Sequence, residues 1–318
     1  MDRHSCWLFF SEAMKAPYDQ RFHLEEIATI SMFALLDALV IFFACPFKVI
    51  GLFVLNLCCI AFVISIRVID TRIEREWFTI FRNWLVLVLL IIMYMEHSTL
   101  IPQINPYDVD DLLIGVDRFL FAGYDPTVLM ERFTCPFFTE IFQIVYASFY
   151  FLPAFICFLL YVRGNKIEFH VSASAILIGF YISYIGYYLS PAIGPRFTLN
   201  HVQSIPLDGL LTFHFLRSTL DQVGGITRDC YPSGHALVSV LTVLLARRYY
   251  RPFAKIALAW TILLLISTVY LRYHYFVDII AGIALAVAVH ELVPPIERYI
   301  KTAESCQGAP IADETKLR

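Results

Sequence analysis

Long runs of apolar residues alternate with short polar segments along most of the chain. A helix that crosses a membrane needs roughly 20 mostly apolar residues, within a range of about 17 to 25. Eight runs meet or nearly meet this length, and the pattern predicts a spanning helix at residues 27–44, 49–66, 84–101, 141–161, 171–189, 235–249, 255–271 and 277–293. The segment before residue 27 lacks the continuous apolar region of a secretory signal, so we expect it to be retained.

The runs leave no segment that reads as a soluble domain. We expect a lead-in with two transmembrane helices over residues 1–83, a six-span core over residues 84–297, and a cytoplasmic tail over residues 298–318. The predicted fold class is therefore all-α, a polytopic membrane bundle of about eight helices whose last six form the core.

The composition agrees with a membrane protein. Of the 318 residues, 59% are hydrophobic and 16% are charged, whereas soluble domains carry about 25% charged residues. A net charge of -3 gives no reason to expect nucleic acid as a partner, so we expect membrane lipids instead. The eight cysteines lack C-x-x-C or Cys/His metal spacing, so we predict neither a metal site nor a cofactor.

Basic residues predict the orientation in the membrane. Most of the 24 lysines and arginines fall in loops on one face, which should be cytoplasmic together with both termini. Three polar segments then share the other face, which is periplasmic, extracellular or lumenal. They are the loop after residue 189, "PSGH" at residues 232–235, and "RYHYF" at residues 272–276.

The first of these segments, "YYLSPAIGPRF", carries a single cation, Arg196, just after a span. The planar fork of an arginine can hold two phosphate oxygens at once. The alternative is that Arg196 only anchors a helix end at the membrane surface. The residues leave both interpretations open.

The second segment, "YPSGH", stands at the start of a helix. Backbone N–H groups of Ser233 and Gly234 at that helix terminus could bind an anion, and Gly234 would let the anion approach closely. His235, in the first turn, could donate a proton to a leaving oxygen. The alternative is an ordinary N-cap serine followed by a helix-starting histidine.

The third segment, "STVYLRYHYFVDIIAG", contains His274 and Asp278 at a spacing of four residues. On a helix the two share a face, so the carboxylate can fix one imidazole nitrogen and leave the other free to attack. Arg272 would add a second cation nearby. The alternative is a structural His–Asp pair between helices, which we consider weaker because all three segments lie on one face.

These segments resemble the type 2 phosphatidic acid phosphatase superfamily of lipid phosphatases and phosphotransferases. Its motifs are written K-x6-R-P, P-S-G-H and S-R-x5-H-x3-D; the second is intact at residues 232–235, and the third is retained as His274-x3-Asp278. The resemblance covers residues 111–292. "DLLIGVDRFLFAGYDP" and "GPRF" resemble the branch that contains the inositol phosphorylceramide synthases.

The chain departs from the motifs of the family in two places. Leu189 stands where the first motif has lysine, and Phe197 follows Arg196 in place of proline. Thr268 occupies the arginine position of the third motif, and Arg272 lies four residues later. If the helix continues through this segment, Arg272 shares a face with Thr268 and supplies the missing cation.

The resemblance implies a two-step phosphoryl transfer that needs no metal or cofactor. His274 would attack phosphorus, Asp278 would orient the imidazole, and His235 would protonate the leaving group. The groups that would hold the phosphate oxygens are Arg196, Arg272 and the amides of Ser233 and Gly234.

The sequence thus predicts a lipid phosphate phosphatase with its active site on the non-cytoplasmic face. Water or a lipid or polyol hydroxyl could resolve the phosphohistidine, so a phosphotransferase of the inositol phosphorylceramide synthase kind is the first alternative. A non-catalytic lipid binder or transporter is the second. Isolated polar residues within predicted spans, such as Asp37 and Glu96, could line a transport pathway.

Overall fold

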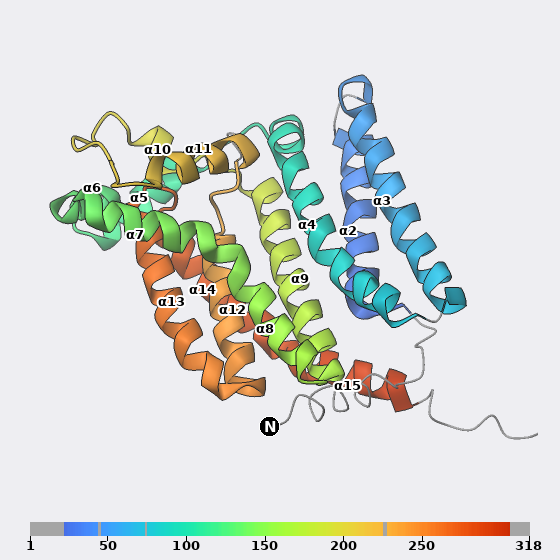
Figure 1. Ribbon diagram of the computed structural model, residues 1–318. Helices are drawn as coiled ribbons and strands as arrows, with labels where there is room; N and C mark the ends of the chain where they lie inside the picture. Colours follow the sequence, from blue (N-terminus) through green and yellow to red (C-terminus); the bar gives the residue numbers. More distant parts are fainter. Residues whose placement is uncertain (1–21, 44–45, 74, 225–227, 306–318) are drawn as a thin grey trace, which may run out of the picture.

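The structure is a computed structural model that describes residues 22–43, 46–73, 75–224 and 228–305 (Figure 1). Across these residues the chain forms helices, and the β pairing consists of an isolated bridge between Ala192 and Asp229. The predicted all-α membrane bundle is confirmed. The start of the predicted lead-in, residues 1–21, and the end of the predicted tail, residues 306–318, lie outside the described residues.

Seven helical segments in the described part of the chain are long and apolar enough to cross a membrane, so the protein is a multi-pass membrane protein. They are Leu24–Phe43 (α2), Val49–Ile73 (within α3, Pro46–Ile73), Glu76–Ile104 (α4), Pro136–Val162 (α7, Pro136–Ala147; η2, Ser148–Tyr150; α8, Phe151–Val162), Lys166–Leu189 (α9), Arg251–Tyr270 (α13) and Phe276–Thr302 (α14, Phe276–Glu291, with α15, Val293–Ser305).

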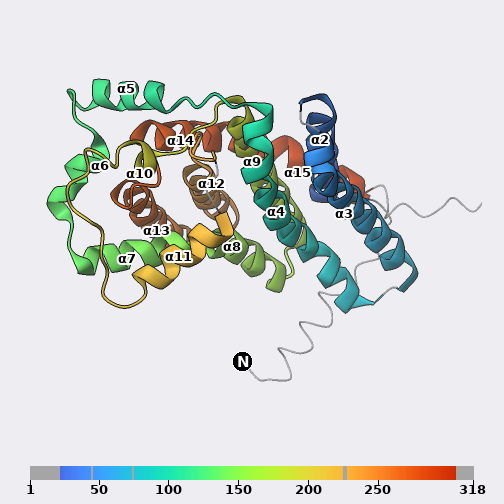
Figure 2. The same ribbon diagram turned by 90° about the horizontal axis from the view of Figure 1, so that it is seen from above.

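The remaining predicted span is α12 (Gly234–Tyr249), which has 16 residues. It stands in the middle of the bundle, where α8, α9, α13 and α14 pack around it (Figure 2). Side chains on several of its faces are buried, among them Leu237, Val238, Leu241 and Leu245. Because neighbouring helices cover α12, it can be shorter than a helix that faces lipid.

The two leading helices belong to the same bundle as the rest. The α2–α3 hairpin lies beside α4 (Figure 1), and α2 also packs on α9. Arg82 of α4 joins the three helices, because its guanidinium contacts Glu26 of α2 at 2.6 Å and Asp70 of α3 at 3.1 Å. The boundary predicted after residue 83 falls inside α4.

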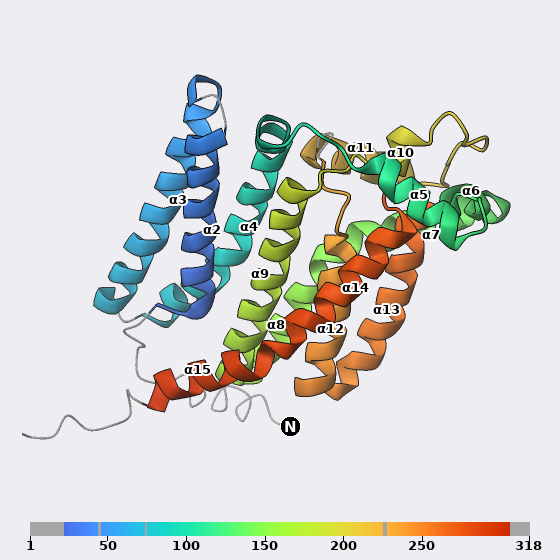
Figure 3. The same ribbon diagram turned by 180° about the vertical axis from the view of Figure 1, so that it is seen from behind.

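Short helices form a layer across one end of the bundle. This cap layer consists of α5 (Asp110–Leu120), α6 (Pro126–Leu129), η1 (Met130–Phe133), α10 (Pro195–Thr198) and α11 (Phe213–Gly224). It lies at the opposite end from α15 (Figures 1 and 3). The start of α12 and the loop between α13 and α14 end beneath the cap layer, so both histidine-bearing segments lie there.

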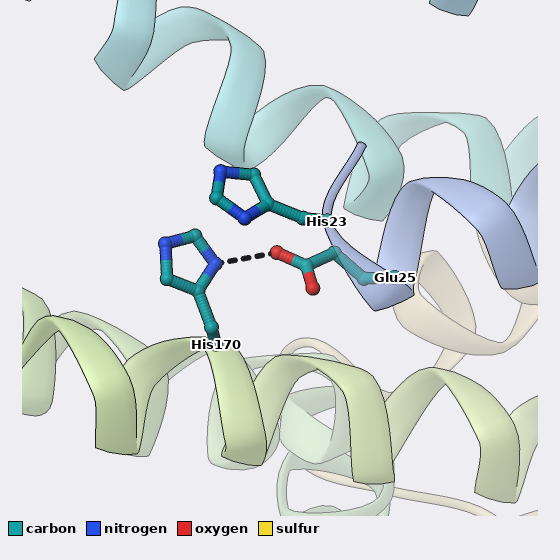
Figure 4. Close-up of side chains that lie close together, drawn as sticks. All are labelled: His23, Glu25 and His170. Atoms are coloured by element: carbon teal, nitrogen blue, oxygen red, sulfur yellow. Dashed lines mark hydrogen bonds and ion pairs between the residues drawn. The ribbon is translucent and has the colours of Figure 1, made fainter. Parts of the chain in front are cut away.

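A separate polar cluster joins α2 to α9 at the other end of the bundle (Figure 4). His170 Nδ1 lies 2.6 Å from the Glu25 carboxylate, which also accepts a hydrogen bond from Ser174 at 3.0 Å. The His23 ring stacks on His170 with centroids 4.0 Å apart and planes inclined by 20°. Nitrogen lone pairs lie in the ring planes, so two nearly parallel imidazoles do not converge on one metal ion. We therefore interpret the cluster as an interhelical hydrogen bond between His170 and Glu25 with a stacked histidine.

Candidate active site

Two histidines from distant segments meet beneath the cap layer. His235 is in the first turn of α12, and His274 lies in the loop between α13 and α14. His235 Nδ1 is 3.1 Å from His274 Nε2. The predicted nucleophile and the predicted proton donor are therefore in direct contact.

The tautomer of His274 follows from its other nitrogen. His274 Nδ1 lies 2.9 Å from the Cys230 carbonyl oxygen and 3.5 Å from Asp278 Oδ2. A carbonyl oxygen only accepts hydrogen bonds, so Nδ1 carries the proton. In the neutral ring, Nε2 then has a free lone pair that faces His235.

The His274–Asp278 contact was predicted, but the predicted reason for it is wrong. Helix α14 begins at Phe276, so His274 does not share a helix with Asp278. Asp278 instead turns back from the first turn of α14 and accepts the Tyr275 N–H at 2.9 Å. Its carboxylate thereby reaches the loop that carries His274.

The start of α12 is packed tightly between its neighbours. Ser233 is the N-cap, and its hydroxyl accepts the Ala236 N–H at 3.2 Å. A Cβ added to Gly234 would lie 2.7 Å from the Tyr187 hydroxyl of α9. The structural alternative for Ser233 and Gly234 is therefore realised. The Ser233 N–H donates to the Asp278 carbonyl oxygen at 3.3 Å, so it is not free for phosphate here, and phosphate binding by Gly234 stays a prediction.

A cavity of about 250 Å³ opens beside the two histidines. Charged groups on its wall include Arg196, Asp221 and Asp229. The wall also contains five tyrosines: Tyr94, Tyr146, Tyr150, Tyr184 and Tyr273. The Tyr146 ring stacks between Tyr273 and His235, with centroids 4.3 and 4.6 Å away, and so helps to hold the His235 imidazole.

Arg196 of α10 lines this cavity, and its binding of phosphate stays a prediction. Gly194, two residues earlier, has a φ of 101°. A side chain there would press against the Tyr273 carbonyl, 3.1 Å from the added Cβ. The Arg196 guanidinium is paired with Asp221 of α11 at 2.5 and 2.7 Å. These two hydrogen bonds raise the pKa of Arg196.

Arg272 is not brought to the cavity wall. Its guanidinium contacts Glu131 at 2.9 Å and the Ile205 carbonyl at 2.6 Å. Helix α13 ends at Tyr270, and Arg272 has a φ of 67°, so the helical register with Thr268 that the prediction required does not exist. The geometric argument for Arg272 as a replacement cation is thus wrong, because a helix-ending turn intervenes.

Another cation, Arg217 of α11, lies near Arg196, and sequence reasoning missed it. Its guanidinium lies 5.9 Å from the Tyr273 ring centroid, and that of Arg196 lies 5.8 Å from the same ring. Burial, with a contribution from the nearby positive charge of Arg196, lowers the pKa of Arg217. No sequence signal pointed to this residue, because it lies in a short helix between predicted spans and belongs to no motif.

Two aspartates of α5 were also missed as parts of the site. Asp110 accepts the N–H groups of Ile193 and Gly194, both at 2.9 Å, just before Arg196. Asp117 accepts the first two N–H groups of α14, from Phe276 at 2.8 Å and Val277 at 2.9 Å. Their spacing of seven residues on a short helix could have indicated a common face. Helix α5 therefore braces both loops that carry candidate catalytic groups.

Comparison with known proteins gives a family match over the same region. The family model of the PAP2 superfamily matches residues 111–292, more than half of the chain. A PA-phosphatase related-family protein of Dictyostelium discoideum is 28% identical over 171 residues, which cover 47% of this chain and 31% of that relative. The match thus spans about a third of the length of the relative. No solved structure matches.

Proposed function

The chain belongs to the PAP2 superfamily, and we propose that it is a lipid phosphate phosphatase that works through a phosphohistidine on His274. One observation carries the proposal. The protonated Nδ1 of His274 is held by the Cys230 carbonyl, and the free Nε2 faces His235 across 3.1 Å at a cavity that Arg196 also lines. This arrangement presents an imidazole lone pair and a proton donor to one phosphoryl group.

The proposed first step breaks the ester bond. A phosphoryl group enters between the two rings, and His274 Nε2 forms a bond to phosphorus while the bond to the leaving oxygen breaks. His235 gives that oxygen a proton. Arg196, once released from Asp221, would stabilise the negative charge on the equatorial oxygens.

The second step resolves the phosphohistidine. Water attacks phosphorus, His235 takes the proton from the water, and His274 is restored as the leaving group. Asp278 and the Cys230 carbonyl would stabilise the positively charged, phosphorylated imidazole that exists between the two transfers.

Transfer to a hydroxyl-bearing acceptor is the second candidate. It is favoured by the tyrosines and aspartates that line the cavity, because hydroxyls and carboxylates are groups that hydrogen-bond a polyol. Of these, the Tyr94 hydroxyl already donates to Asp229 at 2.6 Å. In that case the acceptor hydroxyl would take the place of water in the second step. The phosphotransferase that we predicted as an alternative would use the same histidines.

We further propose that the site faces away from the cytoplasm. The distribution of lysine and arginine supports this orientation. The described chain also begins at α2 and ends at α15 at the end of the bundle opposite the cap layer, which puts both ends on the side away from the histidines (Figure 1).

The decisive experiment traps the intermediate. Purified protein in detergent micelles would be incubated with ³²P-labelled phosphatidic acid and other lipid phosphates, with and without an acceptor alcohol, and then quenched in alkali. We expect alkali-stable, acid-labile label on the peptide that contains His274, and no label or turnover in His274→Ala. His214→Ala is the control, because His214 is an exposed histidine of α11. Activity of His274→Ala within about tenfold of the wild type would overturn the assignment.

A further inference from the structure

Three potential metal ligands meet behind the His274 ring, on the side away from the nucleophilic nitrogen. Asp278 Oδ2 lies 2.9 Å from Cys230 Sγ and 3.5 Å from His274 Nδ1. Cys230 Sγ lies 3.7 Å from His274 Nδ1. All three side chains are buried. A thiol, an imidazole and a carboxylate thus form a small, enclosed triangle.

The triangle has nearly the size of a zinc site. Zinc bonds of about 2.3 Å to sulfur and about 2.0 to 2.1 Å to nitrogen and oxygen, at tetrahedral angles, put the ligand atoms roughly 3.3 to 3.6 Å apart. The longer two of the three observed separations match within a few tenths of an ångström, and the shortest needs to open by about half an ångström. In addition, Asp278 Oδ1 is buried without a hydrogen-bond partner, so this carboxylate has an unused acceptor.

We propose that Cys230, His274 and Asp278 form a binding site for a zinc-like divalent cation, and that an ion bound there inhibits the enzyme. Thiolate, imidazole and carboxylate together are a ligand set that suits Zn²⁺, and three protein ligands leave a fourth position for water. Cys230 and His274 both line the cavity, which gives the ion a route to the site. The His23–Glu25–His170 cluster lacks this convergence, because its imidazoles are stacked.

The inhibitory effect follows from the proton balance. The Cys230 thiol releases its proton to solvent when the metal–sulfur bond forms. The metal also takes the lone pair position of Nδ1, so the single proton of the neutral His274 ring moves to Nε2. A protonated Nε2 has no lone pair with which to attack phosphorus, and no oxidation or reduction is involved. This consequence rests on the proposed function, whereas metal binding does not.

Binding is tested first, with Co²⁺ as a spectroscopic probe. Purified wild-type protein in detergent would be titrated with Co²⁺ and the thiolate-to-cobalt absorption measured, followed by displacement with Zn²⁺. We expect the band in the wild type and in Cys135→Ser, a control that removes another free cysteine. We expect its loss in Cys230→Ser, because a hydroxyl replaces the thiol. An equal band in Cys230→Ser would overturn the site.

A measurement on the unaltered protein covers the case in which Cys230→Ser does not fold. X-ray absorption at the zinc edge of wild-type protein loaded with one equivalent of Zn²⁺ reports the ligands directly. We expect one sulfur together with nitrogen and oxygen ligands. A zinc coordination shell without sulfur, or with two or more sulfur atoms, would contradict the proposed ligand set.

Inhibition is tested separately. Zn²⁺ should stop phosphate release by the wild type and Cys135→Ser, and EDTA should restore it. Cys230→Ser keeps an O–H donor for Asp278, and we expect its remaining activity to need at least tenfold more Zn²⁺ for the same inhibition. Equal Zn²⁺ sensitivity of the two variants would place the inhibition elsewhere and overturn the proposal. Metal binding as expected, in a protein that hydrolyses no lipid phosphate, would instead refute the proposed function and leave the site standing.

Discussion

Arg196 and Asp221 form a two-pronged ion pair, with nitrogen-to-oxygen distances of 2.5 and 2.7 Å, on the wall of the cavity that contains both histidines. The pair uses the same guanidinium edge that would hold two phosphate oxygens. If Arg196 binds the substrate phosphate as we propose, the phosphate competes with Asp221 for this guanidinium.

Asp221→Asn should accordingly strengthen substrate binding. The Asp221 side chain is 40% exposed, and a pair this exposed contributes roughly 0.2 to 1 kcal/mol, so we expect KM for an anionic lipid phosphate to fall by up to about fivefold. Steady-state kinetics would measure it, with Asp208→Asn as the control because Asp208 pairs with the exposed His214. A higher KM in Asp221→Asn would mean that Asp221 holds Arg196 in its binding position instead.

His235→Ala should lower kcat/KM most for substrates whose leaving oxygen must be protonated. General acid catalysis contributes about 10²- to 10⁴-fold, so we expect a loss of this order for alkyl phosphate esters, whose leaving oxygens are strongly basic. Aryl phosphates leave readily as anions, and their turnover should fall by less than about tenfold. Equal losses for both kinds of substrate, measured as kcat/KM, would argue against the proton-donor role.

Substitutions of Arg217 and Arg272 should have different effects, the first on substrate binding and the second on stability. Arg217→Ala is expected to raise KM by a few-fold, since it removes positive charge near Arg196. Arg272→Ala should instead lower Tm, because it leaves the buried Glu131 carboxylate without its cation. Kinetics and thermal unfolding of both variants would test this. An unchanged Tm with a raised KM in Arg272→Ala would return Arg272 to the phosphate site.

The sequence predicted which residues form the site better than how they are arranged. His235 and His274 could be identified because each belongs to a short local motif. The His274–Asp278 contact was also predicted, although it depends on a helix start at Phe276 and not on a shared helix. A spacing of four residues is compatible with either geometry, so the pattern could not distinguish them.

Contacts between distant segments could not be predicted from local patterns. Arg272 was placed on a continuing helix, whereas the N–H groups of Tyr273 and His274 both turn back to the Thr268 carbonyl, at 2.9 and 3.2 Å. No local pattern pointed to the roles of Asp110 and Asp117, because their hydrogen-bond partners lie 83 to 165 positions away. Such roles depend on which loops meet after the bundle has assembled.

Labelling from one side of the membrane would test the proposed orientation. Single cysteines at Asn200 and Arg251 lie on exposed positions at opposite ends of the bundle. A membrane-impermeant thiol reagent should modify Asn200→Cys in intact cells or sealed vesicles, and Arg251→Cys only after permeabilisation. The unsubstituted protein sets the background from native cysteines. The reverse pattern would place the histidines on the cytoplasmic face.

Asp117 should make the stability of the cap layer depend on pH. Burial raises the pKa of the Asp117 carboxyl from 3.8 to about 6, although it accepts two N–H groups of α14. A carboxyl whose pKa is higher in the folded state binds its proton more tightly there. Its contribution to the free energy of unfolding is therefore fully present below about pH 4 and is lost as the pH rises through about 6.

Asp117→Asn removes this titration and keeps a side chain of the same shape. We therefore expect the Tm of the wild type minus that of Asp117→Asn to be largest near pH 4 and to decrease by pH 7, by an amount that corresponds to roughly 2 kcal/mol. Thermal unfolding of both proteins in the same detergent across this range would measure the difference, and all other titrating groups cancel in the comparison. Asp111→Asn, an exposed change on the same helix, should leave the pH profile of the wild type unaltered. If the Tm difference between wild type and Asp117→Asn were the same at every pH, then Asp117 would already be ionised at pH 4, and its hydrogen bonds to Phe276 and Val277 would outweigh the cost of its burial.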